Sequence, residues 1–231
     1  MNNQPTHEDE IFKEKRKPKN PIKFKLVLNE EQKEAKSKIL DNTITLLAGA
    51  AGSGKTLLAC QIALEKLFMR DIEKVIITRP TVSKEEIGFL PGDLREKMDP
   101  WVQPIYQNMF LLYDKDKIEK CISEGSIEIV PLSFMRGRTF VNNFVIVDEA
   151  QNVTHEQMHM IVTRIGLNSK MVICGDDAQI DLKKKADSGF KFLYKAASKI
   201  KKLEAIKLST NHRDPIVEDL LRYYDDSAIT I

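Results

Sequence analysis

Residues 49–56 have the sequence Gly-Ala-Ala-Gly-Ser-Gly-Lys-Thr, which completes the pattern G-x-x-x-x-G-K-[ST]. The apolar run 43–48 precedes this segment and a helical pattern follows it, so the strand, loop and helix of a phosphate-binding loop are all present. Glycines let backbone N–H groups turn inward around phosphate oxygens, and the next helix adds the positive end of its dipole. The pattern predicts a nucleoside triphosphate site in preference to a glycine-rich turn without chemistry.

Two side chains of this loop suit the phosphates and the metal ion of a bound nucleotide. We expect Lys55 to reach the β- and γ-phosphates as a point charge, and the hydroxyl of Thr56 to coordinate Mg²⁺. The cofactors predicted are therefore ATP and Mg²⁺. The predicted nucleotide-binding residues of the loop are Gly49, Ala50, Ala51, Gly52, Ser53, Gly54, Lys55 and Thr56.

An acid pair closes a second apolar run, at residues 144–147. In a parallel sheet such a strand delivers its carboxylates to the edge where ligands bind. We expect Asp148 to hold the hydration shell of Mg²⁺, and Glu149 to orient and deprotonate an attacking water. Together with the phosphate loop, the pair predicts an ATPase.

A third polar segment, Gly-Asp-Asp-Ala-Gln-Ile-Asp at residues 175–181, follows the fifth apolar strand pattern. This loop leaves the same carboxyl edge, so Gln179 is placed to contact the γ-phosphate or its water. A neutral amide there senses whether the phosphate is present. A surface turn is the alternative interpretation of this segment alone.

Apolar strand patterns alternate with helical patterns along the rest of the chain, which predicts an α/β fold with a three-layer, doubly wound parallel sheet. Strands are expected at 43–48, 75–79, 127–130, 144–148, 171–175 and 205–208. Helices are expected near 30–40, 55–69, 154–165, 187–200 and 215–224, with a further helix over 93–112 that breaks near Pro100 and Pro104. Residues 26–231 are predicted to form one domain.

Residues 1–25 are polar and end in a basic run at 13–19, so we expect a disordered tail, either a solvated arm or one that binds polyanions. The chain has 231 residues and a net charge of only +2, so affinity for nucleic acid has to come from local patches. Three widely spaced cysteines suggest reduced thiols and a cytoplasmic protein. The N-terminus has no secretory h-region, and no run reaches the ~18 apolar residues of a membrane span.

Six blocks of sequence resemble the signature of the PhoH-like ATPases. They lie in order at residues 78–80, 88–92, 131–139, 148–151, 163–166 and 175–181, within a resemblance that covers about residues 28–224. That family is similar to the first RecA-like domain of superfamily 1 helicases. The resemblance implies a RecA-like P-loop NTPase core, ATP hydrolysis and a role in RNA metabolism.

The resemblance also implies roles for single residues. Gln32 corresponds to the glutamine that reads the adenine edge in a helicase Q-motif, and Arg213 to an arginine that senses the γ-phosphate. The family's usual Arg-His-Pro is Arg-Asp-Pro here. Arg79 lies where helicase-like cores contact the phosphodiester backbone, and Arg136 and Arg138 lie in a family-like block, so these three are the nucleic-acid candidates.

Residues 155–159 satisfy the zinc-protease pattern H-E-x-x-H. The alternative is structural: Thr154 is placed to cap a helix, and Gln157 three residues later completes a capping box. A catalytic zinc needs a third ligand, and the sequence after His159 offers no evident one. We therefore favour the structural interpretation.

The combined expectation is a Mg²⁺-dependent ATPase, helicase-like, that works on RNA or single-stranded DNA. The competing hypothesis is an ATP-gated binding module or switch without translocation. A small-molecule kinase also uses a phosphate loop, but Glu149 and Gln179 favour water as the acceptor. Because helicases close the ATP site between two such domains, we expect a homo-oligomer, by analogy a hexameric ring, in which Arg213 faces a neighbour's nucleotide.

Overall fold

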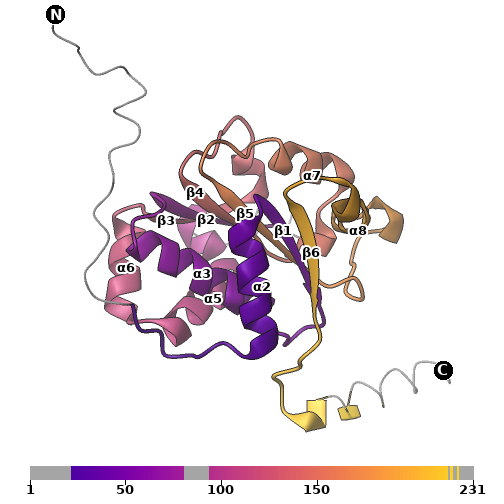
Figure 1. The fold of residues 1–231 in the computed structure, drawn as a ribbon, viewed down its shortest axis with the longest axis horizontal. Coiled ribbons are helices and arrows are strands. Elements are labelled where there is room, and N and C mark those ends of the chain that lie inside the picture. Colours follow the sequence, from indigo (N-terminus) through magenta and orange to yellow (C-terminus); the bar gives the residue numbers. More distant parts are fainter. Residues whose placement is uncertain (1–21, 81–93, 218, 221–222, 224–231) are drawn as a thin grey trace, which may run out of the picture.

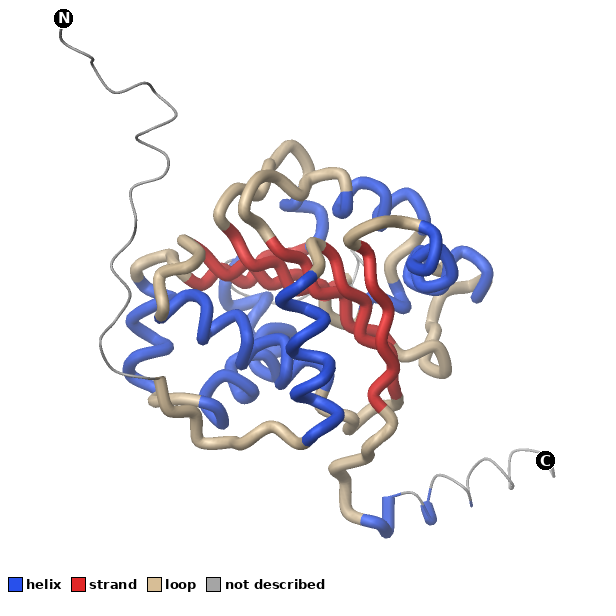
Figure 2. Tube along the Cα trace, in the orientation of Figure 1, coloured by secondary structure: helices blue, strands red, loops and turns tan. Residues whose placement is uncertain are grey.

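The computed structural model describes residues 22–80, 94–217, 219–220 and 223. They form a six-stranded parallel sheet with the order β3-β2-β4-β5-β1-β6. Figure 2 shows the strands as one twisted layer with helices on both sides, which confirms the predicted three-layer α/β fold. The strands are β1 (Ile44–Gly49), β2 (Lys74–Arg79), β3 (Ile127–Pro131), β4 (Asn143–Val147), β5 (Lys170–Gly175) and β6 (Leu203–Leu208).

The helices divide between the two faces of the sheet (Figure 1). One face carries α2 (Glu30–Asp41), α3 (Lys55–Phe68), α5 (Leu94–Leu112) and α6 (Lys115–Ser123). The other carries α7 (His155–Val162) and α8 (Gly189–Ala196), together with the short 3₁₀ turns η1 (Leu132–Met135), η2 (Ala150–Asn152), η3 (Lys185–Asp187) and η4 (Ala197–Lys199).

Alternating side chains along each strand build two separate cores. In β4, Phe144 and Ile146 pack with the helices α2, α3, α5 and α6, whereas Val145 and Val147 pack with α7 and α8. This is the two-residue period of a strand, and both faces are covered because helices flank the sheet. Burial on both faces explains why the strands have nearly continuous apolar sequences.

The order of the strands brings the three chemical segments together. β1 lies beside β5, and β5 lies beside β4, with Ala48 paired with Gly175 and Val147 paired with Ile173. The phosphate loop, the acid pair and the Gln179 loop therefore all leave the carboxyl edge at three adjacent strands. Ligands bind at this edge in open α/β sheets.

Two expectations about helices are wrong. α5 runs without a break through Pro100 and Pro104, because an apolar stripe that includes Val102, Ile105 and Met109 is buried against the core and holds the helix together. The helix α6 was not predicted at all, although the side chain of Asp114 caps it by accepting a hydrogen bond from Lys117 N.

Other expectations fall outside the described residues. Residues 1–21 of the predicted tail, and the family-like block at 88–92, are among these. None of the helices in the described part of the chain combines the length and the apolar character that a membrane span requires.

Candidate nucleotide-hydrolysis site

The phosphate loop begins at the end of β1 and leads into α3, as the sequence predicts. Gly52 has a φ of 88°, in the region that favours glycine, and a Cβ there would lie 2.7 Å from Arg213 Cγ. A Cβ on Gly49 would lie 2.5 Å from the carbonyl oxygen of Leu208. Glycine is needed at both positions because neighbouring segments approach the loop backbone closely.

The charged and hydroxyl side chains of the loop point to distinct partners. Lys55 Nζ donates hydrogen bonds to the carbonyl oxygens of Gly49 at 2.7 Å and Ala50 at 2.9 Å, which holds the ammonium across the loop. Thr56 Oγ1 donates to Asp148 Oδ1 at 2.6 Å. The hydroxyl and the carboxylate thus meet at the start of α3.

This pair of oxygen ligands suits Mg²⁺. Asp148 is 7 % exposed, and burial raises the pKa of its carboxyl, while the hydrogen bond from Thr56 opposes that shift. A divalent cation would offset the cost of keeping the buried carboxylate ionised. Groups of three His, Cys, Asp or Glu side chains suited to a metal are absent from the described residues, but Mg²⁺ keeps several waters and needs few protein ligands.

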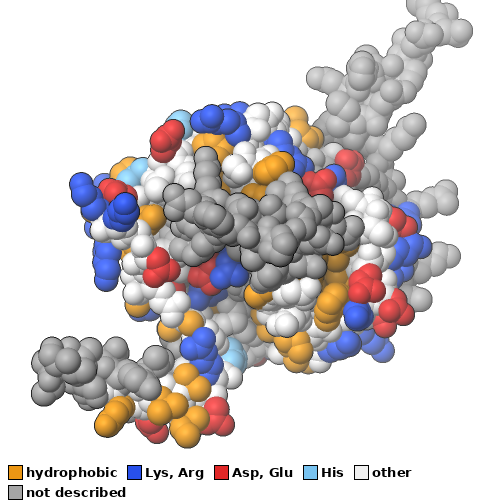
Figure 3. Space-filling model, turned by 180° about the vertical axis from the view of Figure 1, so that it is seen from behind, with side chains coloured by type: hydrophobic (Ala, Val, Ile, Leu, Met, Phe, Trp, Pro, Cys, Tyr) orange, Lys and Arg blue, Asp and Glu red, His pale blue; other side chains and the backbone are white. Residues whose placement is uncertain are grey.

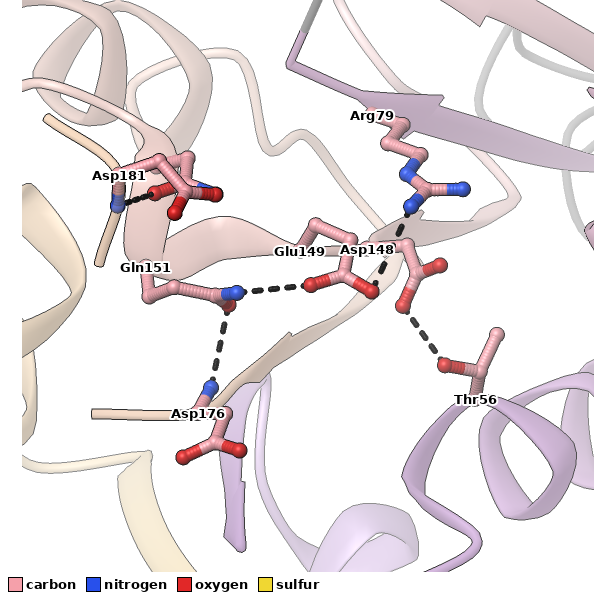
Figure 4. Close-up of polar contacts among 8 residues, drawn as sticks. Thr56, Arg79, Asp148, Glu149, Gln151, Asp176 and Asp181 are labelled. Carbon is pink, nitrogen blue, oxygen red and sulfur yellow. Dashed lines mark hydrogen bonds and ion pairs between the residues drawn. The ribbon is translucent and has the colours of Figure 1, made fainter. Parts of the chain in front are cut away.

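Glu149 turns its carboxylate away from that pair. Its φ is 50°, in the left-handed region, which costs a non-glycine residue about 1 kcal/mol. Arg79 Nη2 lies 3.5 Å from Oε1, and Gln151 Nε2 donates to Oε2 at 2.7 Å. Figure 4 shows the Glu149 carboxylate between these two groups, while the neighbouring Asp148 points toward Thr56.

Gln151 continues the contacts from Glu149 to the phosphate loop. Its Oε1 accepts a hydrogen bond from Asp176 N at 3.1 Å, and Asp176 Oδ2 accepts one from Ala51 N at 3.1 Å (Figure 4). Gln151 is 1 % exposed. Sequence reasoning placed both Gln151 and Asp176 in motifs but gave neither a role.

One cavity of about 520 Å³ joins these elements. It brings together predicted site residues from five parts of the chain, so the main expectation about the site's composition agrees with the geometry. The predicted residues that line it are Gln32, Ala51, Gly52, Gly54, Lys55, Thr56, Asp148, Glu149, Gln179 and Arg213. Gly49, Ala50 and Ser53 belong to the same loop but do not line the cavity.

The far end of the cavity is formed by residues that the sequence did not single out. Leu26 and Leu28 give it an apolar wall, and Asn108 and His212 add polar groups. Gln32 Nε2 lies 3.4 Å from His212 Nε2, and Gln32 also completes the capping box of α2. No local motif marks these residues, since the wall comes from three distant segments.

Arg213 lies against the phosphate loop of its own chain. The closeness of its Cγ, Cδ and Nε to the Cβ position of Gly52 shows this, and the backbone of His212 donates to Gly52 O at 3.1 Å. The sequence favoured a neighbour's nucleotide as the target of Arg213. The single chain instead directs it to its own cavity, because the segment after β6 folds back over the loop.

The remaining nucleic-acid candidates lie apart from this cavity. Arg138 Nη2 forms an ion pair with Glu128 Oε2 at 2.8 Å, and its guanidinium lies 5.9 Å from the centre of the Phe140 ring. Arg136 is exposed. Burial tends to raise the pKa of Glu128, but hydrogen bonds from Lys74 and Arg138 outweigh this and lower it.

The zinc-like pattern lies at the start of α7. Thr154 and Gln157 form the predicted capping box. His155 Nε2 lies 3.0 Å from the carbonyl oxygen of Ala186, and its ring packs edge-on against Phe192. The ring is thus engaged in tertiary packing.

Comparison with known proteins places the whole described core in one family. The family model described as "PhoH-like protein" matches residues 26–225. A PhoH-like protein of Bacillus subtilis is 42 % identical over 197 residues, which cover 84 % of this chain and 62 % of that protein. One from Synechocystis is 39 % identical over 198 residues, covering 83 % and 60 %. The chain thus spans about three fifths of the length of these relatives.

Among solved structures, the large terminase of a bacteriophage that infects a thermophilic bacterium has a similar fold. The TM-score is 0.55 at 10 % identity, over 85 % of this chain and 50 % of the terminase chain. At such low identity the likeness concerns the fold alone.

Proposed function

We propose that this chain, which belongs to the PhoH-like family, binds ATP with Mg²⁺ and hydrolyses the γ-phosphate by in-line attack of water. The observation that carries the proposal is the meeting of Thr56 and Asp148 at 2.6 Å beside the glycine loop, with Glu149 next in the chain. These are the oxygen ligands and the acid that metal-assisted phosphoryl transfer to water requires.

Each side chain of the site has a place in this chemistry. The Lys55 ammonium exchanges its loop carbonyls for phosphate oxygens, and Thr56 and Asp148 hold the metal ion. Bound Mg²⁺ would neutralise charge on the phosphate oxygens. Gln32, which lines the far end of the cavity, is the candidate for recognising the adenine edge.

Water is the favoured acceptor of the phosphoryl group. Glu149 lines the cavity and carries the carboxylate suited to take a proton from water. Gln179 also lines the cavity, where its amide orients water or contacts the γ-phosphate. The acid and the amide occupy the place that a kinase needs for its acceptor substrate.

Single-stranded nucleic acid, RNA in the first instance, is the partner we propose for this ATPase. Arg79 ends β2 beside Glu149, and Arg136 is exposed after β3. Figure 3 shows Lys and Arg side chains in separate groups at the margin of the rear face, as expected for local patches on a chain of net charge +2. The alternative is an ATP-gated binding module in which no strand is moved.

We also propose that the chain assembles with copies of itself, as a hexameric ring, in a reducing cytoplasm. The last described residues support assembly, because Ile216 is 60 % exposed and Leu220 is 51 % exposed on a segment that stands off from the body (Figure 1). The free thiols of Cys60 and Cys174 are buried, which suits a reducing environment.

Phosphate release from ATP tests the proposal. We expect hydrolysis in Mg²⁺, loss of hydrolysis in EDTA, and loss of both binding and hydrolysis in Lys55→Ala. Single-stranded RNA should raise kcat, whereas the switch hypothesis predicts that ATP changes RNA affinity while RNA leaves kcat unchanged. Absence of hydrolysis with and without RNA would reject the ATPase.

A further inference from the structure

Both oxygens of the Glu149 carboxylate are engaged by side chains from other elements. Arg79 reaches Oε1 from the end of β2, and Gln151 reaches Oε2 from η2 (Figure 4). A base that takes a proton from water needs an accessible lone pair directed at that water. The two contacts therefore direct the carboxylate toward Arg79 and Gln151.

The two contacts differ in strength and in accessibility. The Arg79 guanidinium lies at 3.5 Å, and the side chains of the pair are 25 % and 38 % exposed, so this ion pair is weak and open to solvent. The contact to the buried Gln151 is a hydrogen bond of 2.7 Å. A solute that competes for Glu149's partners will therefore displace Arg79 first.

A phosphodiester is the competitor that suits this guanidinium. Arginine binds phosphate oxygens through paired, charge-assisted hydrogen bonds, which are stronger than a single contact at 3.5 Å. The remaining Gln151 contact connects Glu149 through Asp176 to Ala51 of the phosphate loop. Once Arg79 leaves, Gln151 still positions the carboxylate relative to the nucleotide.

We propose that Arg79 is shared between Glu149 and a phosphodiester of single-stranded nucleic acid. Binding of the strand withdraws the guanidinium from Glu149 and frees one carboxylate oxygen for the attacking water. Nucleic acid and the catalytic base thus compete for one cation, and this competition couples strand binding to hydrolysis. The inference rests on the proposed ATPase function for its catalytic consequence.

The competition has a consequence for binding that needs no ATP. Coupling between two sites is reciprocal, so removal of Glu149 must tighten nucleic-acid binding if the strand releases Glu149. We expect Glu149→Ala to bind a labelled oligouridylate about fivefold tighter than the natural chain at low salt, the low end of such couplings. Glu149→Gln, which keeps the shape of the side chain, should change affinity in the same direction.

The control is Glu156→Ala, which removes the same charge from an exposed position on α7. It should tighten binding much less than Glu149→Ala. In the Arg79→Gln background, the effect of Glu149→Ala should disappear, because the shared cation is gone. An oligodeoxynucleotide of equal length distinguishes RNA from DNA as the preferred strand.

The catalytic consequence is measured on the same proteins. Arg79→Gln should raise kcat without nucleic acid, leave KM for ATP unchanged and abolish stimulation, while Arg79→Lys should retain part of the stimulation. The inference is overturned if Glu149→Ala binds no tighter than Glu156→Ala, or if Arg79→Gln lowers basal kcat. If the natural chain hydrolyses no ATP, the proposed function fails, and the binding measurements still decide the competition for Arg79.

Discussion

Asp148 and Glu149 are adjacent in the chain, yet their carboxylates face different partners. The left-handed backbone of Glu149 turns its side chain toward Arg79 and Gln151, while the buried Asp148 meets Thr56. Backbone strain of this kind persists where the surrounding contacts hold it. It separates a metal ligand from a proton acceptor within two consecutive residues.

This separation predicts distinct effects of substitution at the acid pair. Glu149→Gln should slow hydrolysis by about 10²-fold or more, since an amide cannot accept the proton of water. Titration calorimetry should find ATP affinity close to that of the natural chain, because Glu149 does not hold the nucleotide. Lys55→Ala serves as the comparison that loses binding. A hydrolysis rate near the natural one in Glu149→Gln would remove Glu149 from its role.

Gly52 and Arg213 should behave as one unit. A methyl group at residue 52 would meet the Arg213 side chain at 2.7 Å, so Gly52→Ala displaces the arginine in addition to straining the backbone. We expect hydrolysis to fall in both Gly52→Ala and Arg213→Ala, and the double variant to lose less than the sum by about 1 kcal/mol of transition-state free energy.

Gly125→Ala is the matched control for this cycle. Its φ of 73° is similar to that of Gly52, and a Cβ there would meet nothing within 4 Å. It should lower the free energy of unfolding through backbone strain but leave kcat unchanged. Additive effects of Gly52→Ala and Arg213→Ala would show that Arg213 acts elsewhere than over Gly52.

At the scale of elements, α2 fixes the segment that carries Arg213. The Glu31 carboxylate accepts hydrogen bonds from the backbone N–H groups of Ser209 at 2.6 Å and Thr210 at 3.1 Å. The Ser209 bond is the main reason that the pKa of Glu31 lies below its usual range, and partial burial opposes it. A helix at one edge of the cavity thus holds a loop at the other.

This contact predicts a dependence of stability on pH. Because the folded-state pKa of Glu31 is lowered, its contribution is complete above the unfolded value, about 4.3, and is lost as pH falls through the folded value. Urea unfolding should find Glu31→Gln less stable than the natural chain at pH 7, with the difference shrinking below about pH 4. Glu30→Gln, an exposed neighbour, should show little difference at either pH.

The sequence predicts elements better than it predicts what holds them in place. Local periodicity identified all six described strands, since each is buried on both faces. It gave a false break in α5, because the packing of Ile105 and Met109 overrides the local effect of proline. It missed α6, whose single buried residue, Ile118, gives a weak pattern.

The same limit applies to the site. Lys55, Asp148 and Glu149 were predictable because strand, loop and helix context places them at one edge. The role of Gln151 was not, since it depends on contacts with two other loops. Strand order and the return of the chain after β6 depend on pairings between residues far apart in sequence, which no local pattern specifies.

At the scale of the molecule, completion of the cavity and assembly are separate questions. Arg213 comes to its own phosphate loop, while Ile216 and Leu220 are exposed on the segment that follows. A neighbour is therefore not needed to supply an arginine. The apolar residues that stand off from the body are the part of the chain that copies would cover.

Subunit mixing distinguishes these roles. If Arg213 acts within its own chain, a mixture of Arg213→Ala and Lys55→Ala subunits should show only the sum of their separate activities, since each chain lacks one group of its own site. The Arg213→Ala chain alone should bind ATP and hydrolyse it about 10²-fold more slowly. Ile216→Asp with Leu220→Asp should reduce the mass measured by light scattering, because charges oppose burial of that surface, yet keep basal hydrolysis. Recovery of activity on mixing would place Arg213 at a neighbour's nucleotide, as the helicase analogy suggested, and loss of hydrolysis on dissociation would agree with it.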